Sequence, residues 1–298
     1  MNILVCGAGA IGQLYGGYLA LAGHQVGLLN STGLMRSQAF QLEQLDGSQQ
    51  RWQCTQLTTP ADVILVTTKA YQVIPAVKQL LQQRRLNSPC ILVLLHNGMG
   101  PAEQILPLLP AHCQLILASS RHGALRTAAN NVKHTGIGQT DMGAAATNDD
   151  HLKALTQLFS SMPGDTFWHQ NIWQPLWQKL LINAVINPLT ARDQVANGNL
   201  LAPHYAAEIS QLCSEGAAVA RAAGITMQDD QLVEQVRQVA QATAANRSSM
   251  LQDVLHQRPT EIDYISGYLV QQAQTFKLPS AGHQALLTQI HQLAPSNG

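Results

Sequence analysis

Short apolar runs alternate with helical patterns through the first half of the chain. Five runs of mostly apolar residues predict buried strands, at 2–6, 25–29, 62–68, 90–95 and 114–118. A helical pattern extends from the first run to about Ala22, and another, with apolar residues at 73, 77, 80 and 81, follows the third run. Apolar strands alternating with helices are typical of a parallel sheet covered on both faces, so the pattern predicts an α/β fold.

The pattern changes after about residue 150, where strand-like runs largely disappear. Segments with helical spacing take their place, at roughly 151–161, 173–190, 205–223, 229–245 and 260–276. We therefore expect a first domain over 1–168 and an all-helical second domain over 169–298, with the boundary near 167–171. The sequence between them has no low-complexity linker, so we expect a packed junction with the active site between the two domains.

Composition narrows the class of protein. The 298 residues carry zero formal net charge, with 17 basic and 17 acidic residues, so nucleic acid is not an expected partner. The five cysteines are scattered and form no C-x-x-C pair, which favours a reduced, cytoplasmic protein over a disulfide or zinc scaffold. Because the first apolar run breaks at Gly7 and no apolar run could span a bilayer, we expect neither a signal peptide nor a membrane partner.

A G-x-G-x-x-G motif follows the first predicted strand and opens the first predicted helix, as in Rossmann-type, doubly wound dinucleotide-binding sheets. The first glycine permits a tight turn, the second lets the backbone approach a pyrophosphate, and the third lets the helix pack close to the sheet. The alternative is a flexible turn without a ligand. We expect a cofactor to bind at the six residues of the motif, which are Gly7, Ala8, Gly9, Ala10, Ile11 and Gly12.

The end of the second predicted strand bears on the choice of cofactor. An acidic residue there would bind the ribose hydroxyl of NAD, and an arginine would accept the 2′-phosphate of NADP, but this chain has Asn30, Ser31 and Thr32. The missing carboxylate removes repulsion against a phosphate, and these side chains can donate hydrogen bonds to it, which favours NADP. Arg36 could also reach a phosphate, although a solvated helix charge is the simpler interpretation.

Three polar side chains recur at helical spacing in the segment 177–190. Lys179, Asn183 and Asn187 are four residues apart and share one face of the predicted helix, whose other residues are mostly apolar. A buried lysine has a lowered pKa, which suits it to protonate an oxygen that develops negative charge. The alternative is a lysine whose head group reaches solvent from a core helix, beside two structural asparagines.

Two further polar segments have both a structural and a functional interpretation. Thr260 could cap a helix that begins at Glu261, in which case this glutamate only favours the helix dipole. Asn97 and Gly98 follow the fourth predicted strand, at the sheet edge where doubly wound folds bind ligands, but they could also form an ordinary turn.

Taken together, these segments resemble the 2-dehydropantoate 2-reductase (ketopantoate reductase) family over nearly the whole chain. The resemblance rests on residues 7–12, 68–70, 96–100, 179–190, 248–253 and 261–264. It implies NADPH-dependent reduction of 2-dehydropantoate to (R)-pantoate, a step of pantothenate and coenzyme A biosynthesis. It also implies a small 2-keto acid as the partner, a monomer or a homodimer, and no metal.

The resemblance also implies roles for individual residues. Lys179 would be the general acid, with Glu261 as the second catalytic residue and close to the cofactor. The substrate would be bound by Asn97, Asn183, Asn187, Asn197, Asn246, Ser248 and Ser249, and the cofactor also by Lys69, Asn97 and Ala124. The arginine usual in the family near the end of the second strand is absent here. Two alternatives remain, a reductase of another small branched 2-keto acid and a non-catalytic NADP(H)-binding sensor.

Overall fold

A computed structural model describes residues 1–30, 33–146, 152 and 154–295. The chain divides into two compact units, which we call unit 1 (Met1–His96 and Pro101–Ile172) and unit 2 (Asn97–Gly100 and Trp173–Gly298). The expected boundary after residue 168 lies shortly before Trp173, where unit 2 resumes. Nothing in the sequence pattern predicted that the short segment Asn97–Gly100 packs with unit 2.

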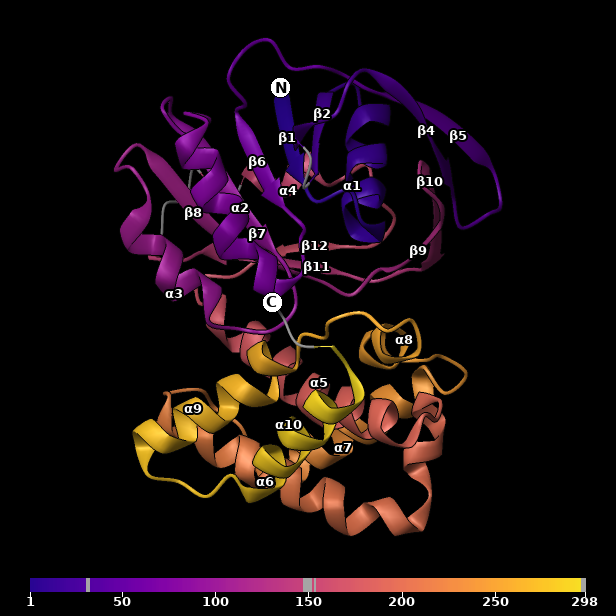
Figure 1. The fold of residues 1–298 in the computed structure, drawn as a ribbon, viewed down its shortest axis with the longest axis vertical. Helices are drawn as coiled ribbons and strands as arrows, with labels where there is room; N and C mark the ends of the chain where they lie inside the picture. Colours follow the sequence, from indigo (N-terminus) through magenta and orange to yellow (C-terminus); the bar gives the residue numbers. More distant parts are fainter. Residues whose placement is uncertain (31–32, 147–151, 153, 296–298) are drawn as a thin grey trace. The chain divides into compact units, whose positions relative to one another are not determined.

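Among the described residues of unit 1, the larger sheet has eight strands in the order β12-β11-β8-β7-β6-β1-β2-β3 (Figure 1). Its five parallel central strands are those predicted: β1 (Asn2–Cys6), β2 (Gln25–Asn30), β6 (Val63–Val66), β7 (Cys90–Leu95) and β8 (Cys113–Ser120). Three edge strands were not predicted: β3 (Gly33–Leu34), β11 (Thr140–Ala144) and β12 (Thr166–Trp168). The sheet is thus mostly parallel, and the predicted α/β class is confirmed.

The strand order determines which face of the sheet each long helix of unit 1 covers. Helix α1 (Ala10–Leu21) leads from β1 to β2, whereas α2 (Ala70–Gln82) leads from β6 to β7, in the opposite direction along the sheet. Because such crossovers are right-handed, the two helices cover opposite faces. The strand order reverses at β1, and ligands of such sheets bind beyond the carboxyl ends at this point. Unit 1 also contains the short helices α3 (Pro101–Ile105), η1 (Leu106–Leu108) and α4 (Leu155–Leu158).

A second sheet in unit 1 was missed by the sequence analysis. It consists of β5 (Gln49–Cys54), β4 (Gln38–Glu43), β10 (Asn131–Gly136) and β9 (Gly123–Ala128), in that order. Helix α1 lies between the two sheets and contacts both (Figure 1). The rings of Phe40 and Trp52 stack across β4 and β5 with centroids 4.7 Å apart. This pair closes the core over α1.

All regular elements of unit 2 are helices in its described residues. Its elements are α5 (Trp173–Asp193), η3 (Asn197–Leu201), η4 (Pro203–Tyr205), α6 (Ala206–Ala222), α7 (Asp229–Ala242), α8 (Ser249–Leu255), η5 (Ile262–Tyr264), α9 (Ser266–Phe276) and α10 (Ala281–Leu293). Helix α5 packs against α6, α7, α8 and α10 (Figure 1). It is therefore the central helix of the core of unit 2.

Two of the predicted helices were wrong in extent. Within the expected helix over 151–161, the described residues form only one α-helical turn, α4, and they leave it at Phe159; positions 151 and 153 lie outside the described residues. The expected helix over 260–276 is broken: the 3₁₀ turn η5 comes first, and α9 begins only at Ser266. The break is at Ile265, whose φ of −111° and ψ of −88° are not helical. The backbone there leaves the helix although the apolar spacing continues.

Two neighbouring histidines of unit 1 are buried, and burial disfavours the charged form of each. The backbone N–H of Gly138 donates to Nδ1 of His122 (3.2 Å), so the proton of this ring is on Nε2. The Nε2–H of His134 donates to the carbonyl of Gly136 (3.0 Å) and lies 3.2 Å from the same Nδ1, and the hydroxyl of Tyr18 donates to Nδ1 of His134 (3.0 Å). Burial, and then the neighbouring His134, lower the pKa of His122 to about 4. Burial also lowers the pKa of His134.

Unit 1 should therefore lose stability in mild acid. The unfolded chain protonates His122 below about pH 6.5, but the folded chain protonates it only near pH 4, so stability falls between these values by about 2 kcal/mol. We expect the melting temperature to fall less over this range in His122→Asn, whose amide oxygen can still accept from Gly138. The exposed His256→Asn is the matched control. An unchanged pH profile in His122→Asn would contradict this explanation.

Candidate active site

Helix α5 presents the central polar face of unit 2. Since α5 is continuous over Trp173–Asp193, Lys179, Asn183 and Asn187 do share one face, as the four-residue spacing predicted. The first two side chains are half-buried and Asn187 is buried. One positive and two amide groups thus line a single face of a helix whose remaining positions are largely in the core.

The next turn of α5 is joined to the start of α8 through two hydroxyl groups. Thr190 Oγ1 lies 2.7 Å from the carbonyl oxygen of Ile186 and 2.8 Å from Oγ of Ser248, within hydrogen-bonding distance of both. Ser248 caps α8, because its Oγ accepts the backbone N–H of Leu251 (3.0 Å). The Ser248 hydroxyl therefore holds α8 against α5, and the neighbouring Ser249 is exposed at the first position of α8.

Asn197, at the start of η3, is bound to the connection between α7 and α8. Its backbone N–H donates to the carbonyl of Asn246 (2.9 Å), and its Nδ2 donates to Oγ1 of Thr243 (2.9 Å). The Oδ1 of Asn197 is buried and accepts no hydrogen bond from the protein. An unsatisfied buried acceptor is costly, so this oxygen is suited to a donor from a ligand or water. The side chain of Asn246 is exposed.

The loop Asn97–Gly100 brings a second polar pair into unit 2. Asn97 Nδ2 donates to Oε2 of Glu261 (3.4 Å), a side chain only 4% exposed. The backbone N–H of Met99 donates to the carbonyl of Tyr264 (2.8 Å). Gly98 has a φ of +76°, and a Cβ there would lie 2.5 Å from the same carbonyl oxygen, so the turn requires glycine. The loop is more than an ordinary turn, since its backbone docks on η5.

The capping interpretation of Glu261 was wrong. This residue precedes the 3₁₀ turn η5 and does not begin an α-helix. Thr260 does act locally, since its Oγ1 accepts the backbone N–H of Ile262 (3.4 Å). The carboxylate of Glu261 is instead engaged by Asn97, a residue 164 positions earlier in the chain. The contact joins Glu261 to a distant segment of the chain and not to the end of a helix.

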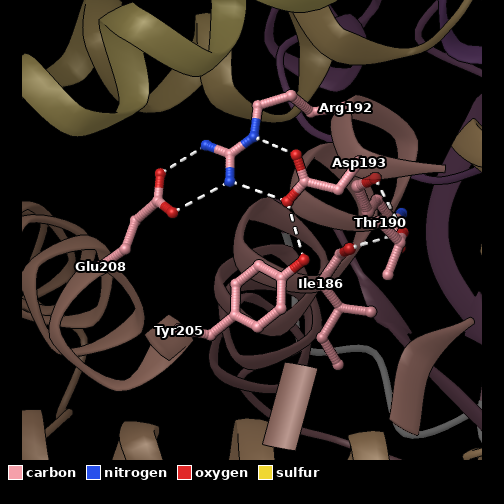
Figure 2. A network of polar contacts seen from close by, with 7 residues as sticks. Ile186, Thr190, Arg192, Asp193, Tyr205 and Glu208 are labelled. Atoms are coloured by element: carbon pink, nitrogen blue, oxygen red, sulfur yellow. Dashed lines mark hydrogen bonds and ion pairs between the residues drawn. The ribbon is translucent and has the colours of Figure 1, made fainter. Parts of the chain in front are cut away.

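Figure 2 shows the network that fixes the carboxyl end of α5. Arg192 makes paired hydrogen bonds to the carboxylates of Asp193 (2.8 and 2.9 Å) and Glu208 (2.6 and 3.0 Å). The hydroxyl of Tyr205 donates to Oδ2 of Asp193 (2.9 Å). The hydrogen-bonded Arg192 lowers the pKa of Asp193. Because Glu208 belongs to α6 and Tyr205 to η4, the network ties three elements together and holds α5 in position.

The glycine turn of unit 1 has the conformation that its sequence predicts. Gly7 has a φ of +112°, which favours glycine, and its N–H donates to the carbonyl of Leu29 (2.8 Å). A Cβ at Gly12 would overlap the carbonyl oxygen of Gly7, so the third glycine allows α1 to start close to the turn. A Cβ at Gly9 would meet no atom within 4 Å. The space above Gly9, at the amino end of α1, is therefore left open by the protein itself.

The other predicted cofactor residues lie in unit 1 at separate elements. Lys69 immediately precedes α2, and Ala124 is in β9. Ser31 and Thr32 are outside the described residues, and Arg36 is exposed. Sequence reasoning missed Arg126, also in β9, whose Nη1 donates to the carbonyl of Ala8 (3.4 Å) within the glycine turn. No local signal pointed to it, because the sheet that carries it was not predicted.

Two kinds of site are not found in the described part of the chain. No group of three or more His, Cys, Asp or Glu residues there could hold a metal ion. None of the helices described is long and apolar enough to cross a membrane.

Comparison with known proteins decides the family. A model of the ketopantoate reductase PanE/ApbA family matches residues 3–147, and a model of the carboxyl-terminal part of the same family matches residues 171–294. The chain is 40% identical over 296 residues to the 2-dehydropantoate 2-reductase of Vibrio cholerae, which covers 99% of both chains. The chain belongs to the ketopantoate reductase PanE/ApbA family.

Solved structures agree with this fold. A ketopantoate reductase of the same family from Ralstonia eutropha superposes with a TM-score of 0.85 at 25% identity, over 98% of both chains. D-mandelate dehydrogenase in its ternary complex with NADH and anilino(oxo)acetate superposes with a TM-score of 0.87 over 98% of this chain and 97% of its own. At 20% identity the latter shows only a shared fold. The two ketopantoate reductase family models fall largely in unit 1 and unit 2 respectively.

Proposed function

We propose that this protein reduces 2-dehydropantoate to (R)-pantoate with NADPH. The observation that carries the proposal is the polar face of α5, with Lys179, Asn183 and Asn187 in one row. Family membership and the name of the Vibrio cholerae relative support the substrate. The product would serve pantothenate and coenzyme A biosynthesis, in the cytoplasm.

The glycine turn fits a dinucleotide. The space above Gly9 is free of protein atoms, and the N–H groups of the first turn of α1 have no partner within the helix. These groups and the helix dipole favour a pyrophosphate at this position. The pyrophosphate would be held by the six residues of the motif, Gly7, Ala8, Gly9, Ala10, Ile11 and Gly12. Other parts of the cofactor would be contacted by Lys69 and Ala124. A bound NADPH would supply the hydride for the carbonyl carbon of the substrate.

The substrate is a small acid with a ketone and a hydroxyl group, so it needs several hydrogen-bond donors and acceptors. The substrate would be oriented from α5 by Asn183 and Asn187. From the segments beside α5 it would also be bound by Asn246, Ser249 and the unsatisfied Oδ1 of Asn197. Ser248 would act mainly through its hydrogen bond with Thr190, which keeps α8 against α5. Asn97 would contact both the substrate and the nicotinamide.

Lys179 would act as the general acid. Hydride addition turns the ketone oxygen into an alkoxide, and a cationic donor placed at that oxygen stabilises the developing charge. The proton held on Nζ of Lys179 would pass to the oxygen and complete the alcohol. The half-buried position of the side chain on α5 supports this role, because electrostatic stabilisation is stronger where water is partly excluded.

Glu261 would be the second catalytic residue, through its charge. We expect Glu261→Gln to lower kcat/KM about 10-fold or more, because the amide can retain the partner Asn97 while the negative charge is lost. The melting temperature should change little. The matched control is the exposed Asp263→Asn in the same turn. A Glu261→Gln variant that is strongly destabilised but has normal activity per folded molecule would contradict a catalytic role.

Arg126 would place a positive charge beside the glycine turn. Its guanidinium reaches the carbonyl of Ala8, so it lies beside the turn that would hold the cofactor phosphates. We expect Arg126→Gln to weaken the binding of both NADPH and NADH about 10-fold in a fluorescence titration, because both cofactors carry the pyrophosphate. Arg36→Gln is the matched comparison and should change NADPH binding little. The opposite ranking of the two variants would assign this role to Arg36.

The function is tested by following NADPH oxidation at steady state. The purified protein should use 2-dehydropantoate with a kcat/KM well above that for branched 2-keto acids that lack the hydroxyl group, and should prefer NADPH to NADH. A preference for the simpler acids would instead identify a reductase of another branched 2-keto acid. If NADPH binds but no 2-keto acid is reduced, the protein is a cofactor-binding sensor.

A further inference from the structure

Two cysteine thiols lie in contact inside unit 1, in a place that the proposed reaction does not use. Cys90 and Cys113 are the first residues of β7 and β8, and they are directly paired in the parallel ladder between these strands. Their Sγ atoms are 3.3 Å apart. Both cysteines are reduced in this structure.

The backbone at this pair suits a covalent bond. Neighbouring strands are about 4.8 Å apart, and disulfides join Cα atoms separated by about 4.4–6.8 Å. Directly paired residues of parallel strands point to the same face of the sheet, so both side chains already approach one another. A bond of about 2.05 Å requires the sulfurs to move together by little more than 1 Å, which small rotations of the two side chains can supply.

The two thiols differ in their access to solvent. Cys90 is buried, whereas Cys113 is half-buried, so an oxidant in solution reaches Cys113 first. Burial and the adjacent Cys113 sulfur raise the pKa of the Cys90 thiol to about 12. Cys90 therefore remains a thiol, and the 3.3 Å contact lets its S–H donate to the sulfur of Cys113.

We propose that Cys90 and Cys113 form a peroxide-sensitive dithiol that closes to a cross-strand disulfide. The Cys113 sulfur attacks hydrogen peroxide, its S–H bond is replaced by S–OH, and one water molecule leaves. The Cys90 sulfur then attacks the Cys113 sulfur, the S–S bond forms, and the S–OH oxygen leaves as a second water with the Cys90 proton. In total two thiols are oxidised to a disulfide, and one peroxide is reduced to two waters.

The position of the pair predicts what oxidation changes. The cysteines lie at the amino ends of β7 and β8, whereas the glycine turn follows the carboxyl end of the parallel strand β1. Oxidation should therefore leave cofactor binding at that edge unchanged. The disulfide would close the chain between residues 90 and 113 and restrict the unfolded state, so the oxidised protein should melt several degrees higher.

Mass spectrometry can identify the disulfide directly. Trypsin cleaves after Arg85 and Arg121, and the peptide between these sites contains Cys90 and Cys113 and no other cysteine. After treatment of the folded protein with hydrogen peroxide, this peptide should be lighter by two hydrogen atoms and should resist alkylation until dithiothreitol is added. Retention of both thiols in the folded protein, under peroxide that oxidises them in urea, would overturn the proposal.

Serine variants test the order of the two steps. Cys90→Ser should stop at a sulfenic acid on Cys113 that dimedone captures, and Cys113→Ser should leave the Cys90 thiol reduced. Cys54→Ala, which changes another buried cysteine of unit 1, should still form the disulfide. Equal loss of the Cys90 thiol in Cys113→Ser and in the wild type would overturn the pairing. The wild-type peptide decides the question even if a serine variant does not fold.

Discussion

Lys179→Ala is expected to lower kcat by about 100-fold or more, because general acid catalysis typically contributes at least this factor. The variant loses both the proton donor and the positive charge at the oxygen that becomes an alkoxide. KM for 2-dehydropantoate should change less than kcat, since Asn183 and Asn187 remain on the same face of α5. Steady-state rates at saturating NADPH and substrate measure the two effects separately. Wild-type turnover in this variant would remove Lys179 from the mechanism.

A second substitution separates charge from proton transfer. Lys179→Arg keeps the positive charge, but a guanidinium does not give up its proton near neutral pH. We expect Lys179→Arg to remain strongly impaired in kcat, while 2-dehydropantoate binding is retained better than in Lys179→Ala. Lys78→Ala, on the exposed side of α2, is the control and should be fully active. Recovery of most of the activity in Lys179→Arg would show that charge alone is required.

The face of α5 could be predicted from sequence because it depends on one local rule. A polar residue at every fourth position of an apolar segment shares a face whenever the segment is a helix, and α5 is continuous. The same holds for the glycine turn, where the conformation of Gly7 and the close packing at Gly12 follow from adjacent elements. Short-range geometry is what a single sequence encodes most directly.

The partners of these residues could not be predicted, since they depend on contacts between distant segments. The hydrogen bond of Asn97 to Glu261 joins two residues that are 164 positions apart in the sequence. The capping interpretation of Glu261 failed for this reason, because local sequence alone favoured a helix start. Thr190 was likewise not singled out, although its hydroxyl bonds with the cap of α8.

The second sheet was missed for a different reason. Phe40 and Leu42 in β4, and Trp52 and Cys54 in β5, alternate with polar residues in the period typical of half-buried strands. The search for long apolar runs passed over this weaker signal. As a result Arg126, which the same sheet carries to the glycine turn, was also missed.

The glycine turn allows a test of cofactor binding that is separate from folding. Gly9→Ala should weaken NADPH binding about 10-fold to 100-fold, because the added methyl group enters the space that a pyrophosphate would occupy and costs its hydrogen bonds to the backbone. The fold should be unaffected. Gly9 has a φ of −75°, which alanine adopts readily, and the new Cβ meets no protein atom within 4 Å. Fluorescence titration with NADPH and a thermal melt measure the two properties.

Gly12→Ala is the matched comparison, since the same methyl group at this position collides with the protein itself. Its Cβ would overlap the carbonyl oxygen of Gly7 and lie 2.6 Å from Oγ1 of Thr67, so α1 must move away from the turn. We expect a loss of about 3 kcal/mol of folding stability, as in other overpacked sites, together with weak binding. The Gly9→Ala variant should bind NADPH poorly but keep a normal melting temperature. The Gly12→Ala variant should bind NADPH poorly and also have a lowered melting temperature. Wild-type NADPH affinity in Gly9→Ala would mean that the pyrophosphate does not bind over this turn.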